Sequence, residues 1–420
     1  MKSSKKKLYE KPIFNQKGIL SSSDMICCCI NSAVGLGVLK LGVAFTSGLL
    51  ISFLLLVIIC FLSFYSYKLL VLSASVCHQS TFEEIWKVQF SKKTIFIPVC
   101  FTVITTLLSI VNYIREIQSY TITIFSKIYF LATDKAELTV LNLKIYKMLV
   151  GCAAFVSFLI PVCFVTHLKT ITKLSYISNF FLILFTIYII IMFGYEVKHL
   201  GFDPDHSFKL FHFKGHITRS LSTTIFAFNF HPLAYPGIRN VINSTKSNLS
   251  NIFRNTMIIV LVYYLIVGTF SYLTFFDKNK SGVILDYYPE NTKTEKILTI
   301  IGRIITLVFI LFTVPHPLNA CRYVILNLVS DVLVFPEEIW RFTGIIISLL
   351  ALCLANLTEK YLNILFTFSD AMASFFLFVF TPLFYLKING LYDRFNAFMS
   401  ILLLLIGAMS TIFSILNNES

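Results

Sequence analysis

The chain has 420 residues, of which 56% are hydrophobic and only 13% are charged, about half the charged share of a soluble globular domain. The net charge of +14 does not indicate nucleic-acid binding, because basic residues are scattered through the loops and only "KSSKKK" at residues 2–7 forms a cluster. Uncharged runs such as 49–67 have the length of a spanning helix and lack the alternation of barrel strands. The composition therefore excludes a soluble domain and predicts an all-α polytopic membrane protein.

The apolar runs predict eleven spans. Their expected limits are 22–47, 49–72, 94–127, 144–165, 174–196, 220–238, 253–276, 296–328, 339–357, 360–386 and 397–416. Residues 1–21 form a basic tail, which the positive-inside rule places in the cytoplasm. The ten cysteines fall mostly inside apolar runs without metal-ligand spacing, so we interpret them as small buried hydrophobes.

Unusual spans recur five positions apart. The third and eighth are longer than a perpendicular crossing needs, and the first and sixth are interrupted by glycine or proline. This predicts a first five-helix repeat at 22–196, a second, inverted repeat at 220–386, and an eleventh helix at 397–416 outside the repeats. Paired interrupted spans in two such halves indicate a transporter binding site.

The first interruption lies in "NSAVGLGVLKLGVAF", residues 31–45. If the helix unwinds between Gly35 and Gly37, freed amides at the second half-helix suit a carboxylate. Carbonyls at the end of the first half-helix, near Asn31 and Val34, suit a cation. The alternative is close helix packing by small residues.

The second interruption is "FNFHP" at residues 228–232, where Pro232 removes a backbone donor and breaks or kinks the helix. Asn229 and His231 add polar side chains at this break. His231 is either a substrate contact or proton site, or a neutral histidine bonded to a carbonyl that the proline frees. Broken backbone at membrane depth requires surrounding protein or a wet cavity.

Three stretches resemble the amino acid/auxin permease family. "INSAVGLGVLKLGVAF" is similar to its first helix and "TIFAFNFHPLAYP" to its sixth. "RIITLVFILFTVPHPLNACRYVI", at 303–325, is similar to the eighth helix of its sodium-coupled neutral amino acid transporter branch. The resemblance implies an eleven-helix LeuT-like fold, with a 5+5 inverted repeat plus one helix, that moves small amino acids by alternating access.

The resemblance also implies residue roles. Asn31 and Thr313 would contribute to a cation site. The substrate carboxylate would bind the backbone amides of Gly35, Leu36 and Gly37. Its ammonium would bind backbone carbonyls near Phe226 to Asn229, and Phe228 and Phe230 would shape the pocket.

The sequence departs from the family pattern at several positions. Leu36 stands where a small residue is usual, Lys40 where a glycine is usual, and Leu233 where an acidic residue often follows the proline; the family's proline near Gly42 or Val43 is missing. Lys40 either extends its side chain to the membrane surface or places its ammonium where a coupling cation would bind.

Other charged residues lie inside expected spans. Glu116 and Asp370 either carry a coupling proton, or belong to a structural pair or lie at the membrane interface. Arg115 is next to Glu116, and adjacent helical residues do not face each other, so we expect separate partners for the two.

We therefore expect a monomeric secondary active transporter of small neutral amino acids, coupled to protons or sodium, in the plasma membrane or a vacuolar or other internal membrane. No cofactor beyond Na⁺ or H⁺ and no nucleic acid is expected; lipid and the amino acid are the partners. The alternative is an amino acid sensor that signals to a cytoplasmic partner, for which the tail of about 20 residues offers little surface. An intramembrane enzyme is not expected, because spans one, six and eight lack clustered acidic or histidine ligands.

Overall fold

The structure is a computed structural model that describes residues 12–14, 18–35, 37–45, 47–133, 153, 163–200, 217–275, 284–286, 288, 292–329, 336–357, 368–369 and 371–416. Within these ranges the regular structure is helical, with one isolated bridge between Leu20 and Val241. The helices are α1 (Ser22–Val34), η1 (Val38–Lys40), α2 (Leu41–Ala44), α3 (Leu49–Cys77), α4 (Phe82–Gln89), η2 (Lys92–Thr94), α5 (Phe96–Thr133), α8 (Leu168–Leu200), α9 (Ile217–Ala227), α10 (His231–Ala234), η4 (Tyr235–Asn240), α11 (Lys246–Phe275), η6 (Ile284–Asp286), α12 (Lys293–Thr313), α13 (Pro315–Val329), α14 (Glu337–Ala355), η7 (Phe376–Phe380), α16 (Thr381–Asn389) and α17 (Arg394–Leu416).

Eight helical stretches in the described part of the chain are long and apolar enough to cross a membrane. They correspond to eight of the eleven expected spans: α3, α5, α8, α11, α12 with α13, α14, residues 371–389, and α17. The first and sixth expected spans are broken into short helices, as the interruptions predict. Most of the expected fourth span, 144–165, lies outside the described residues, so the count of eleven stays a prediction.

Side chains cap the start of some helices. Ser21 and Asp24 form a capping box at α1: the Ser21 hydroxyl accepts from the Asp24 amide at 3.1 Å, and an Asp24 carboxylate oxygen accepts from the Ser21 amide at 2.9 Å. Thr292 and Glu295 form a second box at α12. The Thr245 hydroxyl caps α11 by accepting from the Asn248 amide at 3.2 Å, so α11 begins before the apolar limit of 253.

Several long helices present an apolar stripe to the outside. On α8 the exposed side chains include Phe180, Ile183, Ile187 and Ile191, which recur at helical spacing along one face. Similar exposed apolar residues occur on α3, α14 and α17. Surfaces of this size and composition are compatible with lipid rather than water, so the outer face of the bundle supports a multi-pass membrane protein.

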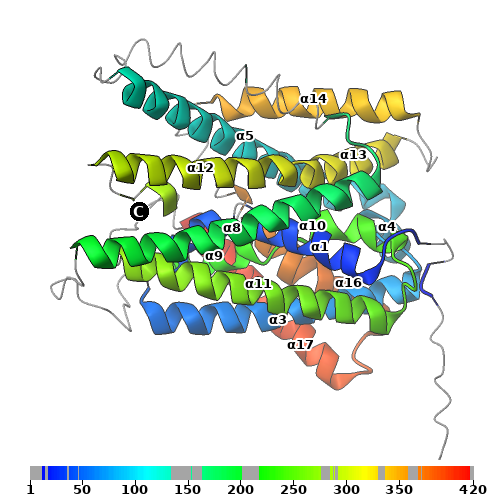
Figure 1. The fold of residues 1–420 in the computed structure, drawn as a ribbon. Helices are drawn as coiled ribbons and strands as arrows, with labels where there is room; N and C mark the ends of the chain where they lie inside the picture. The colour runs from blue at the N-terminus through cyan, green and yellow to red at the C-terminus, as the bar shows by residue number, and fades with distance from the viewer. Residues whose placement is uncertain are drawn as a thin grey trace, which may run out of the picture.

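The two broken helices meet inside the bundle. α1 lies in its middle, between α8 and α11 (Figure 1), and it also packs against α10. α2 packs against α9, so each half of one broken helix touches a half of the other. The long α5 and the α12–α13 pair pack against each other beside them. This arrangement brings the two expected interruptions to one place.

Candidate functional site

The first break occurs where the glycines predict it. α1 ends at Val34, and Gly35 takes φ +30° and ψ −133°, a backbone conformation that favours glycine. The Gly35 amide still donates to the Asn31 carbonyl at 3.2 Å. A Cβ at Gly35 would lie 2.5 Å from the Tyr113 hydroxyl, and one at Gly37 would lie 3.1 Å from the Cα of Ala227. Glycine is therefore required both by the backbone angle and by close neighbours.

The second break separates α9 from α10. α9 ends at Ala227, and α10 begins at His231. Pro232 is the second residue of α10, within the first turn, whose amides have no intrahelical partner in any helix. The missing proline amide thus costs little there, and Pro232 starts the second half-helix rather than kinking a continuous one.

One tyrosine joins the two breaks. The Tyr264 hydroxyl, on α11, lies 2.9 Å from the carbonyl oxygen of Ala33 and 2.7 Å from that of Ala227. These carbonyls belong to the ends of α1 and α9, where the last carbonyls of a helix lack amide partners. The single hydroxyl proton is shared between them, and Tyr264 itself is fully buried. Transporters often coordinate cations with such carbonyls; here a phenol donates to them.

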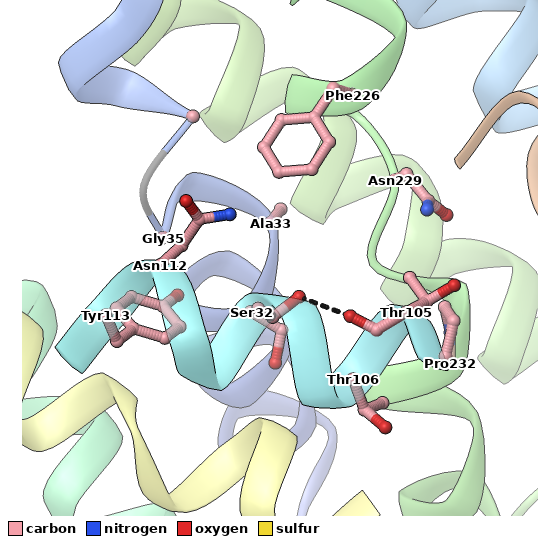
Figure 2. A pocket seen from close by; sticks show the side chains of 12 residues that line it. Ser32, Ala33, Gly35, Thr105, Thr106, Asn112, Tyr113, Phe226, Asn229 and Pro232 are labelled. Atoms are coloured by element: carbon pink, nitrogen blue, oxygen red, sulfur yellow. Dashed lines mark hydrogen bonds between the residues drawn. The ribbon is translucent and has the colours of Figure 1, made fainter. Parts of the chain in front are cut away.

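A cavity of about 40 Å³ lies at the breaks. Figure 2 shows the Phe226 and Asn229 side chains facing the side chains that α5 contributes. The Oδ1 atom of Asn229 has no hydrogen-bond partner among the described residues. Twelve residues line the cavity, and all of them are uncharged: Ser32, Ala33, Gly35, Gly37, Thr105, Thr106, Ser109, Asn112, Tyr113, Phe226, Asn229 and Pro232.

The structure brings Asn31 and Thr313 into direct contact. The Asn31 Oδ1 atom accepts from the Thr313 hydroxyl at 2.7 Å and from the Ser178 hydroxyl at 2.7 Å. The two hydroxyls lie 2.9 Å apart, and both also approach the Phe309 carbonyl, at 3.1 Å from Ser178 and 2.9 Å from Thr313. All three side chains are fully buried or nearly so. This cluster of four oxygens offers the hard ligands that a small cation prefers.

Other residues expected at the site lie away from the cavity wall. Phe228 packs edge-on against Tyr264, with ring centroids 5.2 Å apart, and Phe230 stacks on Tyr67 at 4.5 Å. His231 also stacks on Tyr67, at 3.6 Å, and its Nε2 lies 3.2 Å from the Ser66 hydroxyl. The His231 ring therefore contacts a serine hydroxyl of α3. Val34 is fully buried in the core.

Some expectations fall outside the described residues. Leu36 and Asp370 are not described, and neither are the side chains of Lys40, Val43 and Leu233. The backbone of Lys40 belongs to η1, just beyond the first break. The roles proposed for these five residues stay predictions.

Sequence reasoning missed Ser178, Tyr264 and the polar face of α5. Thr106 and Ser109 donate to the carbonyls of Thr102 and Thr105, four residues earlier. Hydroxyl residues that bond within their own helix are ordinary in apolar helices, so they gave no signal. Their spacing on α5, at 102, 105, 106, 109, 112 and 113, follows one helical face, which was the available clue.

The fold resembles a solved structure, the crystal structure of MhsT in complex with L-phenylalanine. The likeness covers 96% of this chain and 99% of that chain, with a TM-score of 0.67 and 14% sequence identity. At this identity the likeness shows the fold alone, which is the LeuT fold.

A family model described as "transmembrane amino acid transporter protein" matches residues 20–417, nearly the whole chain. The match confirms the family that the three sequence stretches predicted. The two interrupted helices, the uncharged cavity between them and the apolar outer surface agree with this family assignment. The chain therefore belongs to the transmembrane amino acid transporter family and is a multi-pass membrane protein of amino acid transport rather than an enzyme.

Proposed function

We propose that the protein is a secondary active transporter that moves small neutral amino acids across a membrane by alternating access. The observation that carries this proposal is the cavity at the meeting point of the two broken helices, with backbone from both breaks in its wall. Broken backbone at membrane depth is tolerated where it lines a cavity or is enclosed by protein. In transporters it supplies the contacts to substrate and ion.

The cavity suits the two charged ends of an amino acid. The α-carboxylate would lie against the backbone of Gly35 and Gly37, just before η1 begins, because the first amides of a helix have no intrahelical partners. The α-ammonium would donate to the Asn229 Oδ1 atom, a cavity-lining acceptor without a hydrogen-bond partner among the described residues. An ammonium donor would satisfy that buried acceptor.

The lining also supports a small, uncharged substrate side chain. A charged side chain would lose its hydration without a countercharge among the twelve lining residues, which is costly. The volume of about 40 Å³ has room for only a few water molecules. Phe226, whose ring lies on the wall opposite α5 (Figure 2), limits the space further.

In this proposal, amino acid transport is coupled to the movement of an ion, either sodium or a proton. The Asn31, Ser178 and Thr313 oxygens could hold sodium if the two hydroxyl protons turned away from Asn31. As arranged, both hydroxyls donate to the Asn31 Oδ1 atom, so this oxygen has its hydrogen bonds without a cation, whereas the buried Asn31 Nδ2 atom has no partner among the described residues.

The test is uptake by the purified protein in liposomes, with a panel of labelled amino acids and with sodium and proton gradients imposed separately. We expect accumulation of small neutral amino acids, and a raised KM in Asn229→Ala because the ammonium loses its acceptor. Asn356→Ala is the matched control, since the exposed Asn356 side chain donates to the Leu352 carbonyl at the end of α14, away from the cavity. Binding of amino acids without uptake or counterflow would contradict the proposal and favour a sensor. Preferred uptake of basic or acidic amino acids would contradict neutrality.

A further inference from the structure

A second cavity lies on the other side of Ser32. It has a volume of about 180 Å³, and its wall includes Met25 and Cys28 of α1, His316 of α13, Asn240 of η4 and Trp340 of α14. The Ser32 side chain lines both this cavity and the cavity at the breaks. Ser32 is therefore part of the wall of both spaces.

Ser32 contacts a histidine that holds three helices together. His316 is 6% exposed; its Nδ1 lies 3.3 Å from the Ser32 hydroxyl of α1 and its Nε2 lies 2.6 Å from the Ser175 hydroxyl of α8. Thus both ring nitrogens of an α13 residue face hydroxyl oxygens on two other helices.

The two serine hydroxyls offer the ring two acceptors, which only a charged ring can satisfy at once. The Ser32 hydroxyl donates to the Cys28 carbonyl and the Ser175 hydroxyl donates to the Ile171 carbonyl, each at 2.9 Å. A serine has one hydroxyl proton, so both oxygens are left as acceptors toward His316. A neutral imidazole has one N–H and could satisfy only one of them, whereas an imidazolium donates to both. Turning the Ser175 proton toward the ring, or toward the Cys28 sulfur 3.7 Å away, would give up its carbonyl bond.

We propose that His316 is the binding site of a coupling proton, and that its protonation locks α1 to α8 and α13 and so separates the two cavities. The inference rests on the proposed function, since it names the ion that drives transport and the residue that carries it. Loss of the proton into the wider cavity leaves one serine contact without a donor. That weakens the hold on the end of the α1 half-helix that bounds the substrate cavity.

His316 is a better candidate for the proton carrier than the other titratable residues near this cavity. On the wall of the wider cavity, the other titratable residues are Cys28 of α1 and Tyr323 of α13, and the lining residues from α8, η4 and α14 are uncharged. The nearby Arg322 points elsewhere, because it donates to the carbonyls of Cys163 and Val165. His231, the histidine that the sequence singles out, stacks on Tyr67 and is absent from the walls of both cavities.

A fluorescence titration tests proton binding without requiring transport. The chain has two tryptophans, and Trp340 lines the His316 cavity, so Trp86→Phe leaves a single reporter beside the site. We expect Trp340 fluorescence to change with pH, and the change to be lost in His316→Gln. Ser175→Ala removes one acceptor and should weaken proton binding roughly tenfold. His167→Gln is the control, because His167 is an exposed histidine near the same cavity. A full-sized pH transition in His316→Gln would overturn the proposal.

Uptake distinguishes failure of this inference from failure of the proposed function. In liposomes we expect an inward proton gradient to stimulate amino acid uptake by the unaltered protein and by His167→Gln, and to give no stimulation in His316→Gln. If a proton gradient does not change uptake by the unaltered protein, the His316 proposal is overturned, while the proposal of amino acid transport still holds. Neither uptake nor counterflow of any amino acid by the unaltered protein overturns the proposed function itself.

Discussion

Tyr264→Phe should loosen the substrate site while keeping its shape. The substitution removes the one hydroxyl that links the Ala33 and Ala227 carbonyls and leaves the ring, which packs against Phe228, in place. Tyr264 is fully buried, so water cannot easily replace the lost donor. The two helix ends that bound the cavity then have no common partner from α11.

The size of the effect follows from the number of groups left unsatisfied. One donor is lost, and two buried carbonyl oxygens that shared it lose their contact, which together cost about 1 to 3 kcal/mol. The substitution raises the free energy of the conformation in which the two breaks lie close together, which is the conformation that binds substrate in our proposal. Because about 1.4 kcal/mol is tenfold in an equilibrium constant, we expect the substrate Kd to rise about fivefold to a hundredfold.

The assay is equilibrium binding of a labelled transported amino acid to the purified protein. Tyr263→Phe is a matched control: it removes a hydroxyl from the adjacent, partly buried tyrosine of α11, which is not one of the residues bridging the breaks. A Kd for Tyr264→Phe within twofold of the unaltered protein, or equal to that of Tyr263→Phe, would refute the idea that this hydroxyl holds the two breaks together.

Gly35→Ala should abolish substrate binding, because an alanine is strained at this positive φ and its Cβ would lie 2.5 Å from the Tyr113 hydroxyl. Gly194→Ala is the control, since nothing lies within 4 Å of the added Cβ, and it should bind substrate normally. Equal binding by the two variants would contradict this prediction. Ser178→Ala removes one of the two donors to Asn31 and should lower the thermal stability by about 1 kcal/mol, so an unchanged melting temperature would argue against the bond. Burial raises the pKa of the Glu83 carboxyl, on α4 outside the spans. Its ionised form is therefore disfavoured in the folded protein, and stability should fall as pH rises above the ordinary glutamate range. Glu83→Gln should melt at a higher temperature than the unaltered protein at pH 8, with the gap closing at acidic pH; a gap that does not depend on pH would contradict this.

The sequence predicted the two breaks because each depends on residues at the break itself. Glycine permits the positive φ at Gly35, and Pro232 cannot donate within a continuous helix, so both signals are local. The length of α5 and of the α12–α13 pair was equally visible, as long apolar runs. These features locate the site along the chain.

The partners of the breaks were not predictable in the same way. Ser178 and Tyr264 sit in long helices with no motif around them, and their importance comes from the helices they face. A serine that reaches Asn31 looks the same in sequence as one that bonds to its own helix, such as Ser73 to the Leu69 carbonyl. Only the packing of α8 and α11 against α1 separates these cases.

His316 shows what this difference means for coupling. The resemblance drew attention to Thr313, and His316 was not singled out. In the structure, His316 lies one helical turn beyond Thr313, and its partner Ser175 lies three residues before Ser178 on α8. Two layers of contacts therefore join α1 and α8 to the α12–α13 pair: amide and hydroxyl oxygens around Thr313 of α12 in one, and the His316 imidazole of α13 between two hydroxyls in the other. Because Asn31 and Ser32 are adjacent, movement of the α1 half-helix must change both layers together, which gives a proton at His316 a direct mechanical route to the oxygens around Asn31.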